Sequence, residues 1–267
     1  MGEKMSEKNV EKTESKSKSE KPFKTAISQH VDETSYIRGY NLTDLIGKVT
    51  FTEQIYLLLK GELPTEPQRA VLDAMLVACA EHRINVPSIV SARYAYSAGN
   101  TFNSAMAAGI LSIGDYHGGA IDNAAKMFLE NVGKDPEQVA TEMKTAKKRA
   151  PGYGHKVYTT DPRTHKLFTV AKENGLYGKY CKFAESFEVA LEKASGKKLC
   201  LNVDGAVAAL LCELGVDPRF GKGFFALARS AGIAAHVLEE AQTAQPFRTL
   251  RDEDVEFTGV GKRELKR

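Results

Sequence analysis

The sequence predicts an all-α fold. Apolar residues recur at helical spacing in several segments, whereas the strict alternation of apolar and polar residues that marks strands is almost absent. Asn, Asp or Pro precede many of these segments and Gly follows them, which is the usual order of helix start and stop signals. A chain of 267 residues with 42% hydrophobic content can form one good-sized core, or a large domain with a smaller lobe.

The helices are expected to follow a polar N-terminus. Residues 1–22 are rich in Lys, Glu and Ser and have little to bury, so we expect a disordered tail, and a β-prone piece at 25–31 comes next. The segment 103–114 has small apolar side chains on several faces, which predicts a central core helix. In chain order, helices are expected at about 41–46, 51–60, 67–80, 103–114, 118–128, 136–148, 163–174, 178–194, 204–214 and 224–242.

Composition and charge exclude several classes of protein. A formal net charge of +3, without a stripe of basic and aromatic residues, argues against nucleic-acid binding. The four cysteines lack close pairing, so we expect a reducing compartment and no disulfides, and Cys79, Cys200 and Cys212 lie in apolar runs typical of buried thiols. No metal site is expected. No apolar stretch reaches the length of a membrane span, and the N-terminus resembles neither a signal peptide nor a mitochondrial presequence. A cytoplasmic location is therefore expected.

The segment 151–163 combines a glycine loop, a histidine and an arginine. Its two glycines permit backbone conformations that other residues resist and let a ligand approach the main chain. His155 can exchange a proton near neutral pH. Asp161 begins a helix whose first turn contains Arg163, a residue able to hold a carboxylate through two parallel hydrogen bonds. A solvated surface turn is the alternative for such a motif taken alone.

Two histidines stand at helix ends. His82 follows the apolar helix 67–80, and for this residue alone a capping or solvated role is the alternative. His117 precedes two glycines at the start of the helix 118–128. Backbone N–H groups gather at such a helix start and stabilise negative charge that develops during a reaction.

Two charged residues lie in apolar helices. Asp204 stands at the start of the helix 204–214, where the alternative is a helix N-cap. Arg229 interrupts a nearly apolar helix and shares one face with Gly232 and His236. A buried arginine needs an anion, which is either a ligand or a carboxylate of the protein itself.

These motifs resemble the citrate synthase superfamily. The matching stretches are Ile-Arg-Gly-Tyr and Leu-Leu-Leu-Lys-Gly-Glu-Leu-Pro-Thr near the start, then His-Gly-Gly-Ala, Pro-Gly-Tyr-Gly-His, Asp-Pro-Arg, Asn-Val-Asp and Ala-Arg-Ser-Ala-Gly. The resemblance covers about residues 23–260. It implies a catalytic domain over 23–267, in which a small helical lobe at roughly 151–230 is inserted in a large helical domain.

Two features favour one branch of this superfamily. Only sixteen residues separate Thr65 from His82, where full-length citrate synthases carry a long helical insertion, so a shortened fold is expected. The segments around His117 and Asp204 resemble stand-alone citryl-CoA lyases and the C-terminal lyase module of ATP-citrate lyase.

The resemblance implies retro-Claisen cleavage of citryl-CoA to acetyl-CoA and oxaloacetate. It makes His155 the base at the tertiary hydroxyl, His117 the donor to the thioester enolate oxygen and Asp204 the acid at the enolate carbon. The remaining carboxylates would be held by His82, Arg163, Arg229 and Arg248.

The resemblance also assigns binding partners. The last arginine would reach the site of a neighbouring subunit in a homodimer, with Arg251 competing with Arg248 for that place. CoA would be bound as a thioester substrate, without a tightly bound cofactor. Its predicted contacts are Lys148, Ala150, Pro151, Gly152, Tyr153 and Gly154, and a solvated helix end is the alternative for Lys148.

Two other functions stay open. A compact citrate or methylcitrate synthase would condense acetyl-CoA or propionyl-CoA with oxaloacetate, and it is favoured by His117, where the ATP-citrate lyase module carries Phe. A non-catalytic subunit would keep the fold and bind a partner ligase. A lyase of this length would depend on a separate citryl-CoA synthetase, because the sequence lacks a phosphate-binding glycine loop for ATP.

Overall fold

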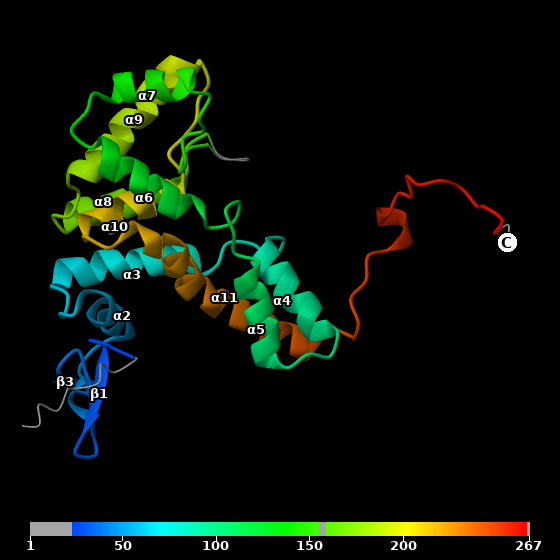
Figure 1. Cartoon of the computed structure of the whole chain (residues 1–267), viewed down its shortest axis with the longest axis horizontal. Coiled ribbons are helices and arrows are strands. Elements are labelled where there is room, and N and C mark those ends of the chain that lie inside the picture. The colour runs from blue at the N-terminus through cyan, green and yellow to red at the C-terminus, as the bar shows by residue number, and fades with distance from the viewer. Residues whose placement is uncertain (1–22, 155–158, 266–267) are drawn as a thin grey trace, which may run out of the picture. The chain divides into compact units, whose positions relative to one another are not determined.

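The computed structural model describes residues 23–154 and 159–265, and most of them are helical, as the sequence predicts (Figure 1). The strands are β1 (Ser28–Val31), β2 (Thr34–Ile37) and β3 (Tyr40–Asn41). The helices are α1 (Leu42–Leu45), α2 (Phe51–Lys60), α3 (Glu66–Ala80), α4 (Pro87–Ser97), α5 (Phe102–Leu111), α6 (Ala120–Asn131), α7 (Pro136–Thr145), α8 (Pro162–Glu173), α9 (Lys179–Ser195), α10 (Val203–Glu213) and α11 (Gly221–Thr243). The predicted disordered tail, 1–22, lies outside the described residues.

The chain divides into two compact units, of which the first ends at Val49. Its described part holds an antiparallel three-stranded sheet in the order β1-β2-β3. The β-prone piece noted in the sequence contains β1, but the sheet was not expected. Asn41 caps α1 as predicted, because its side chain accepts a hydrogen bond from the Thr43 N–H.

The second unit begins at Thr50 and holds the remaining helices. Side-chain caps fix several of their starts: Thr50 and Thr65 form capping boxes at α2 and α3, and Asp161 caps α8 as predicted. The division of this unit into a large domain and a small lobe at roughly 151–230 stays a prediction.

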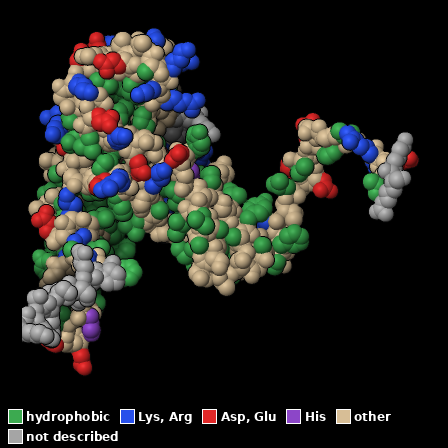
Figure 2. Space-filling view, in the orientation of Figure 1, with side chains coloured by type: hydrophobic (Ala, Val, Ile, Leu, Met, Phe, Trp, Pro, Cys, Tyr) green, Lys and Arg blue, Asp and Glu red, His purple; other side chains and the backbone are tan. Residues whose placement is uncertain are grey.

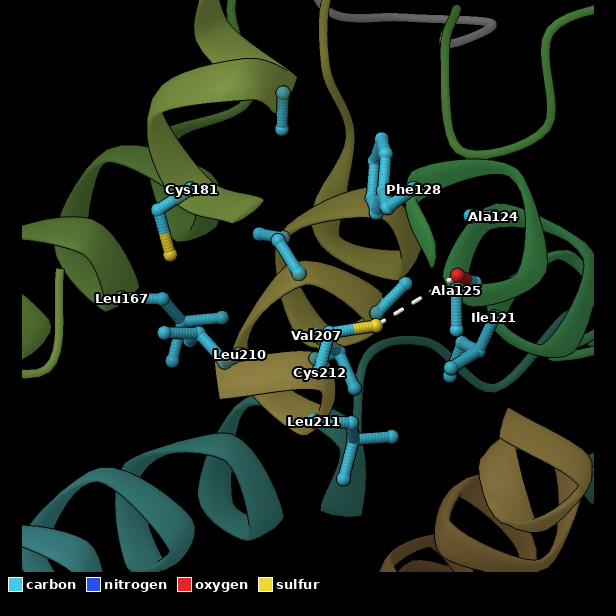
Figure 3. Close-up of a cluster of buried hydrophobic side chains, with 14 of the residues drawn as sticks. Ile121, Ala124, Ala125, Phe128, Leu167, Cys181, Val207, Leu210, Leu211 and Cys212 are labelled. Atoms are coloured by element: carbon cyan, nitrogen blue, oxygen red, sulfur yellow. Dashed lines mark hydrogen bonds between the residues drawn. The ribbon is translucent and has the colours of Figure 1, made fainter. Parts of the chain in front are cut away.

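The core of the second unit is centred on α10. This helix contacts α6, α8 and α9, and its residues from Gly205 to Cys212 are all buried (Figure 3). Figure 3 shows Val207, Leu210 and Leu211 among side chains of the neighbouring helices, with the Cys212 thiol near the Ala125 carbonyl. Small side chains let α10 be enclosed on all faces, because neighbouring helices can approach closely.

The expectation that 103–114 forms the central core is wrong. The helix exists as α5, but only Ala105 and Gly109 are buried, and Leu111 is 84% exposed. The buried side of α5 packs against α4 and α11, and Gly109 lies so close to the Ser88 carbonyl that a side chain there would collide with it. The pattern of small residues thus marks a close helix contact on one face.

The sequence reasoning missed α4. Its N-cap residue is Val86, which offers no side-chain hydrogen bond, and its apolar residues show little periodicity, so the usual start signal is absent. All four cysteines are buried, as the sequence predicts for Cys79, Cys200 and Cys212. In the described ranges no helix is both long and apolar enough to cross a bilayer, and the cytoplasmic location stays a prediction.

Candidate active site

Five residues singled out in the sequence line one pocket of about 220 Å³. They come from the end of α3, the turn before α6, and the helices α8, α10 and α11. They are His82, His117, Arg163, Asp204 and Arg229. A larger cavity of about 680 Å³, between the ends of α4 and α11 and the segment after α11, holds none of them. The smaller pocket is therefore the candidate active site.

Asp204 supplies a carboxyl group at the start of α10. It is not the N-cap, because Asn202 has that role and accepts a hydrogen bond from the Gly205 N–H at 3.1 Å. Burial raises the pKa of Asp204 to about 6, although Arg163 and Arg229 act in the opposite direction. A carboxyl group with a pKa near neutrality can give and take a proton at physiological pH.

His117 is held in place by two elements besides its own turn. Its Nε2 lies 2.8 Å from the Ser88 hydroxyl of α4, and its ring meets the edge of Phe225 of α11 at 5.3 Å. Gly118 has a φ of 82° and abuts the Phe225 ring, so only glycine fits beside the histidine. Burial and the Arg229 charge lower the pKa of His117, which favours the neutral imidazole. A neutral imidazole can donate a hydrogen bond to a developing enolate oxygen.

Arg229 and His82 each have a buried polar atom without a hydrogen-bond partner in the described part of the chain. The Arg229 side chain is buried, and its Nε donates to the Cys79 carbonyl at 2.9 Å, but Nη1 has no hydrogen-bond partner among the described residues. Nε2 of His82 is also buried and has no hydrogen-bond partner among the described residues. Unpaired buried polar atoms are costly, so a ligand that forms hydrogen bonds with both would bind favourably. No described carboxylate forms a hydrogen bond or ion pair with Arg229, although the charges of Glu81 and Asp204 act on its pKa, and ligand binding by Arg229 stays a prediction.

Arg163 is oriented by the residue that caps its helix. Its guanidinium donates to both oxygens of Asp161, at 3.0 and 2.8 Å. Asp161 is 1% exposed and also accepts from the Val203 N–H at 3.1 Å, so it joins the starts of α8 and α10. This pairing sets Arg163 beside Asp204. Sequence reasoning recognised Asp161 only as a cap.

The glycine loop is tied to Asn202, next to Asp204. The Asn202 N–H donates to the Gly152 carbonyl at 3.0 Å, its side chain donates to the Gly154 carbonyl, and the Gly154 N–H donates to Cys200. These hydrogen bonds use the Gly152 and Gly154 carbonyls and the Gly154 N–H, and they fix the loop against the start of α10. The Tyr153 hydroxyl donates to the Ala184 carbonyl, so its side chain belongs to the core.

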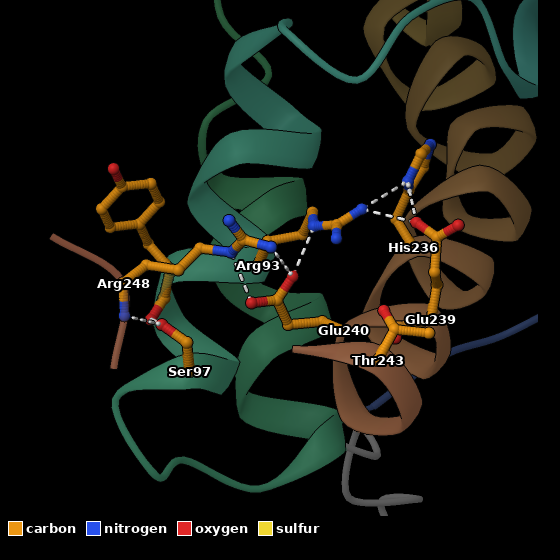
Figure 4. A network of polar contacts seen from close by, with 8 residues as sticks. Arg93, Ser97, His236, Glu239, Glu240, Thr243 and Arg248 are labelled. Carbon is orange, nitrogen blue, oxygen red and sulfur yellow. Dashed lines mark hydrogen bonds and ion pairs between the residues drawn. The ribbon is translucent and has the colours of Figure 1, made fainter. Parts of the chain in front are cut away.

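The remaining predicted residues lie elsewhere. His155 is outside the described residues. Lys148 and Pro151 line another pocket of about 350 Å³ between α6 and α7. Arg248 pairs with Glu240, with Nη2 and Oε2 at 2.7 Å (Figure 4), and Arg251 pairs with Asp254. CoA binding by Lys148 and residues 150–154, and the reach of Arg248 or Arg251 into a neighbouring subunit, stay predictions.

Comparison with known proteins identifies the family. Residues 65–250 match the family model described as citrate synthase, C-terminal domain. The chain belongs to the citrate synthase family. Both the family and the shortened helical fold predicted from the sequence are thereby confirmed.

Solved structures of the citrate synthase family include close matches. A citryl-CoA lyase from Hydrogenobacter thermophilus is 46% identical, with a TM-score of 0.89 over 92% of this chain and 98% of that one. An ATP citrate lyase from Methanothrix soehngenii, in complex with citrate and coenzyme A, is 27% identical, with a TM-score of 0.78 over 91% of this chain and 42% of that one.

Plant relatives of this family member are longer. ATP-citrate synthase beta chain protein 2 of Arabidopsis thaliana is 31% identical over 245 residues, which is 83% of this chain and 38% of the plant protein. The chain thus spans about two fifths of the length of this curated relative.

Proposed function

We propose that this protein is a citryl-CoA lyase, which cleaves citryl-CoA to acetyl-CoA and oxaloacetate. The observation that carries the proposal is the pocket in which Asp204, with a pKa of about 6, lies with a neutral His117 and the unpaired donor of Arg229. The 46% identity to a citryl-CoA lyase over 98% of that chain supports the same activity.

The cleavage needs a base, a donor to oxygen and an acid. The base removes the proton of the tertiary hydroxyl, the bond between that carbon and the thioester α-carbon breaks, and its electrons form the thioester enolate. By the family resemblance His155 is the base, and the enolate oxygen accepts a hydrogen bond from His117. Asp204 then protonates the enolate carbon, so it must carry a proton when cleavage begins.

The carboxylates of the citryl group are bound by cations and by a histidine. Arg229 and His82 offer the two unpaired buried donors, and Arg163 lies beside them with its orientation fixed by Asp161. Charge-assisted hydrogen bonds of this kind contribute about 1.5–3 kcal/mol each. We propose that Arg248 completes the site of a neighbouring subunit, with Arg251 as the alternative.

The CoA portion is proposed to bind along residues 150–154. The pocket lined by Lys148, Pro151 and Lys126 lies next to this loop; Glu130 and Glu142 also line it, and its lysines offer cations for phosphate groups. The loop is joined to Asp204 through Asn202, so the thioester end of the substrate would be close to the acid.

The protein is proposed to form a homodimer through α4 and α5. From Ile84 to Gly114 the only charged residue is Arg93. This part of the surface presents hydrophobic and uncharged side chains with few charges, as Figure 2 shows. Exposed apolar residues on these helices include Val90, Tyr94, Phe102, Ile110 and Leu111. A contiguous uncharged surface of this kind is typical of a subunit interface.

A three-way assay tests the activity. Purified protein is offered citryl-CoA, acetyl-CoA with oxaloacetate, and propionyl-CoA with oxaloacetate, and the products are followed as acetyl-CoA formed or thiol released. A citryl-CoA lyase releases acetyl-CoA from the first substrate, whereas a protein that acts on none of the three is not an enzyme of this kind. Citryl-CoA itself would come from a separate citryl-CoA synthetase.

Compact citrate or methylcitrate synthase is the second candidate. It is favoured by His117, whose neutral imidazole could equally polarise an acyl-CoA thioester for condensation. Thiol release from acetyl-CoA or propionyl-CoA with oxaloacetate, at a rate well above that of citryl-CoA cleavage, would establish this function instead. A non-catalytic subunit predicts that His155→Ala and Asp204→Asn leave citrate cleavage by its complex unchanged.

A further inference from the structure

The last residues of α3 are attached to α11 at three successive points. Cys79 accepts a hydrogen bond from Arg229 Nε at 2.9 Å through its carbonyl. The Ala80 carbonyl lies against Gly232, where any side chain would collide with it. Oε2 of Glu81 lies 3.4 Å from Nε2 of a histidine one turn further along α11, His236. The contacting residues of α11 are spaced by three and four, so they share one face.

His236 is in turn held by charged groups (Figure 4). Its Nδ1 lies 3.3 Å from Arg93 Nη1 of α4 and 3.7 Å from Glu239. Arg93 also pairs with Glu240, whose side chain is 1% exposed, at 2.6 Å. This partly buried network restricts the position of the histidine side chain.

The contact between Glu81 and His236 matters because α3 ends at Glu81. Glu81 has extended backbone angles, φ −148° and ψ 148°, so the ladder of α3 hydrogen bonds does not fix the residue that follows. That residue is His82, whose buried Nε2 has no partner among the described residues. The contact between Glu81 and His236 therefore anchors the residue that directly precedes His82.

We propose that Glu81 and His236 are positioning residues. Their contact fixes the end of α3 on α11 and so holds His82 and Arg229 at the spacing that the substrate carboxylate requires. The inference rests on the proposed function, because it assigns these two donors to the same substrate group.

Steady-state kinetics separates positioning from general stability. Glu81→Ala and His236→Ala are expected to raise the KM for citryl-CoA about tenfold and to change kcat less than about threefold, because they weaken substrate binding in the ground state and the transition state alike. Lys172→Ala is the matched control, since it removes a half-exposed contact of 3.9 Å with Glu185 between two other helices. The KM of this control is expected to equal that of the wild type.

A double-mutant cycle tests whether Glu81 acts through His82. If it does, Glu81→Ala raises KM in the wild type but adds less than about twofold in the His82→Ala background. Independent effects that multiply in the double variant would overturn the inference, as would an unchanged KM in Glu81→Ala.

An NMR measurement on the protein without substrate tests the positioning role independently of the enzymatic activity. The ring signal of His82 in a proton–nitrogen NMR spectrum is assigned by its loss in His82→Ala. It is expected to shift in Glu81→Ala and in His236→Ala but not in Lys172→Ala. If wild-type protein acts on none of the three substrate sets, the proposed function fails, and the NMR result still decides the positioning role: an unmoved His82 signal rejects it.

Discussion

Gly152 and Gly205 lie in backbone contact. A Cβ on Gly205 would come within 2.5 Å of the Gly152 carbonyl oxygen, and one on Gly152 within 2.7 Å of the Gly205 Cα. The contact presses the glycine loop against the first turn of α10, next to Asp204. Two glycine motifs separated by some fifty residues thus serve a single close approach that fixes the Asp204 carboxyl relative to the loop.

Replacing Gly205 with alanine should destabilise the fold. The added methyl group has no space against Gly152, and overpacking of this kind costs about 1–3 kcal/mol. Urea unfolding measures the loss. Gly114→Ala is the control, because no atom lies within 4 Å of the position that its Cβ would occupy. The urea unfolding midpoint of this control should differ little from that of the wild type. Equal midpoints for Gly205→Ala and the wild type would contradict the contact.

The pH dependence of cleavage should report Asp204. Protonated Asp204 is the acid in the proposed direction, and its pKa is about 6, so kcat/KM for citryl-CoA should fall as pH rises above about 6. In the condensation direction the ionised form acts as base, and kcat/KM should fall as pH drops below about 6. Asp204→Asn should lower kcat by about 10²–10⁴-fold. A pH-independent rate between pH 5 and 8 would exclude this role.

The same substitution should stabilise the protein above neutral pH. Because the folded-state pKa is raised from 3.8 to about 6, folding favours the protonated carboxyl, and this contribution is lost as pH rises through 6. Asparagine does not ionise, so Asp204→Asn should be more stable than the wild type by about 1–3 kcal/mol at pH 8. Below pH 3.8 the difference should vanish. Paired urea titrations at pH 4 and pH 8 measure it.

Arg229 should determine how strongly citrate raises the melting temperature of the protein. Citrate is expected to raise the melting temperature of the wild-type protein, because a ligand that binds only the folded state stabilises it. Arg229→Gln removes the buried guanidinium and its unpaired donor, so at least about tenfold more citrate should be needed for the same shift. Arg219→Gln is the control, since Arg219 is exposed and pairs with Asp217. An equal shift in both variants would argue against a carboxylate site at Arg229.

The uncharged surface of α4 and α5 should govern assembly. Leu111 is 84% exposed, and a glutamate there would place a charge in the proposed interface. Light scattering should give twice the 29.2 kDa chain mass for the wild type and the chain mass itself for Leu111→Glu. Val189→Glu is the control, because Val189 is 57% exposed on the charged helix α9. A monomeric wild type would reject the dimer.

The helices that the sequence predicted well carry local signals. Asp161 before Pro162 marks a start that the structure confirms, and Pro67, predicted near the start of its helix, lies in the first turn of α3. The helix α4 was missed because Val86 cannot cap it. The burial of α5 was misjudged because the size of its residues does not say on how many sides other helices approach.

The sequence by itself determined the helical class, the citrate synthase family and five of the residues that meet in the pocket. A motif is a short run of residue types in a fixed order, and both the types and the order can be read directly from the sequence. Only the tertiary structure decided that Asn202 caps α10 in place of Asp204, that Asp161 orients Arg163, and that Arg229 has a carbonyl partner and an unpaired donor. These relationships join atoms far apart in sequence, and their energies depend on burial and distance, which arise only when the helices pack.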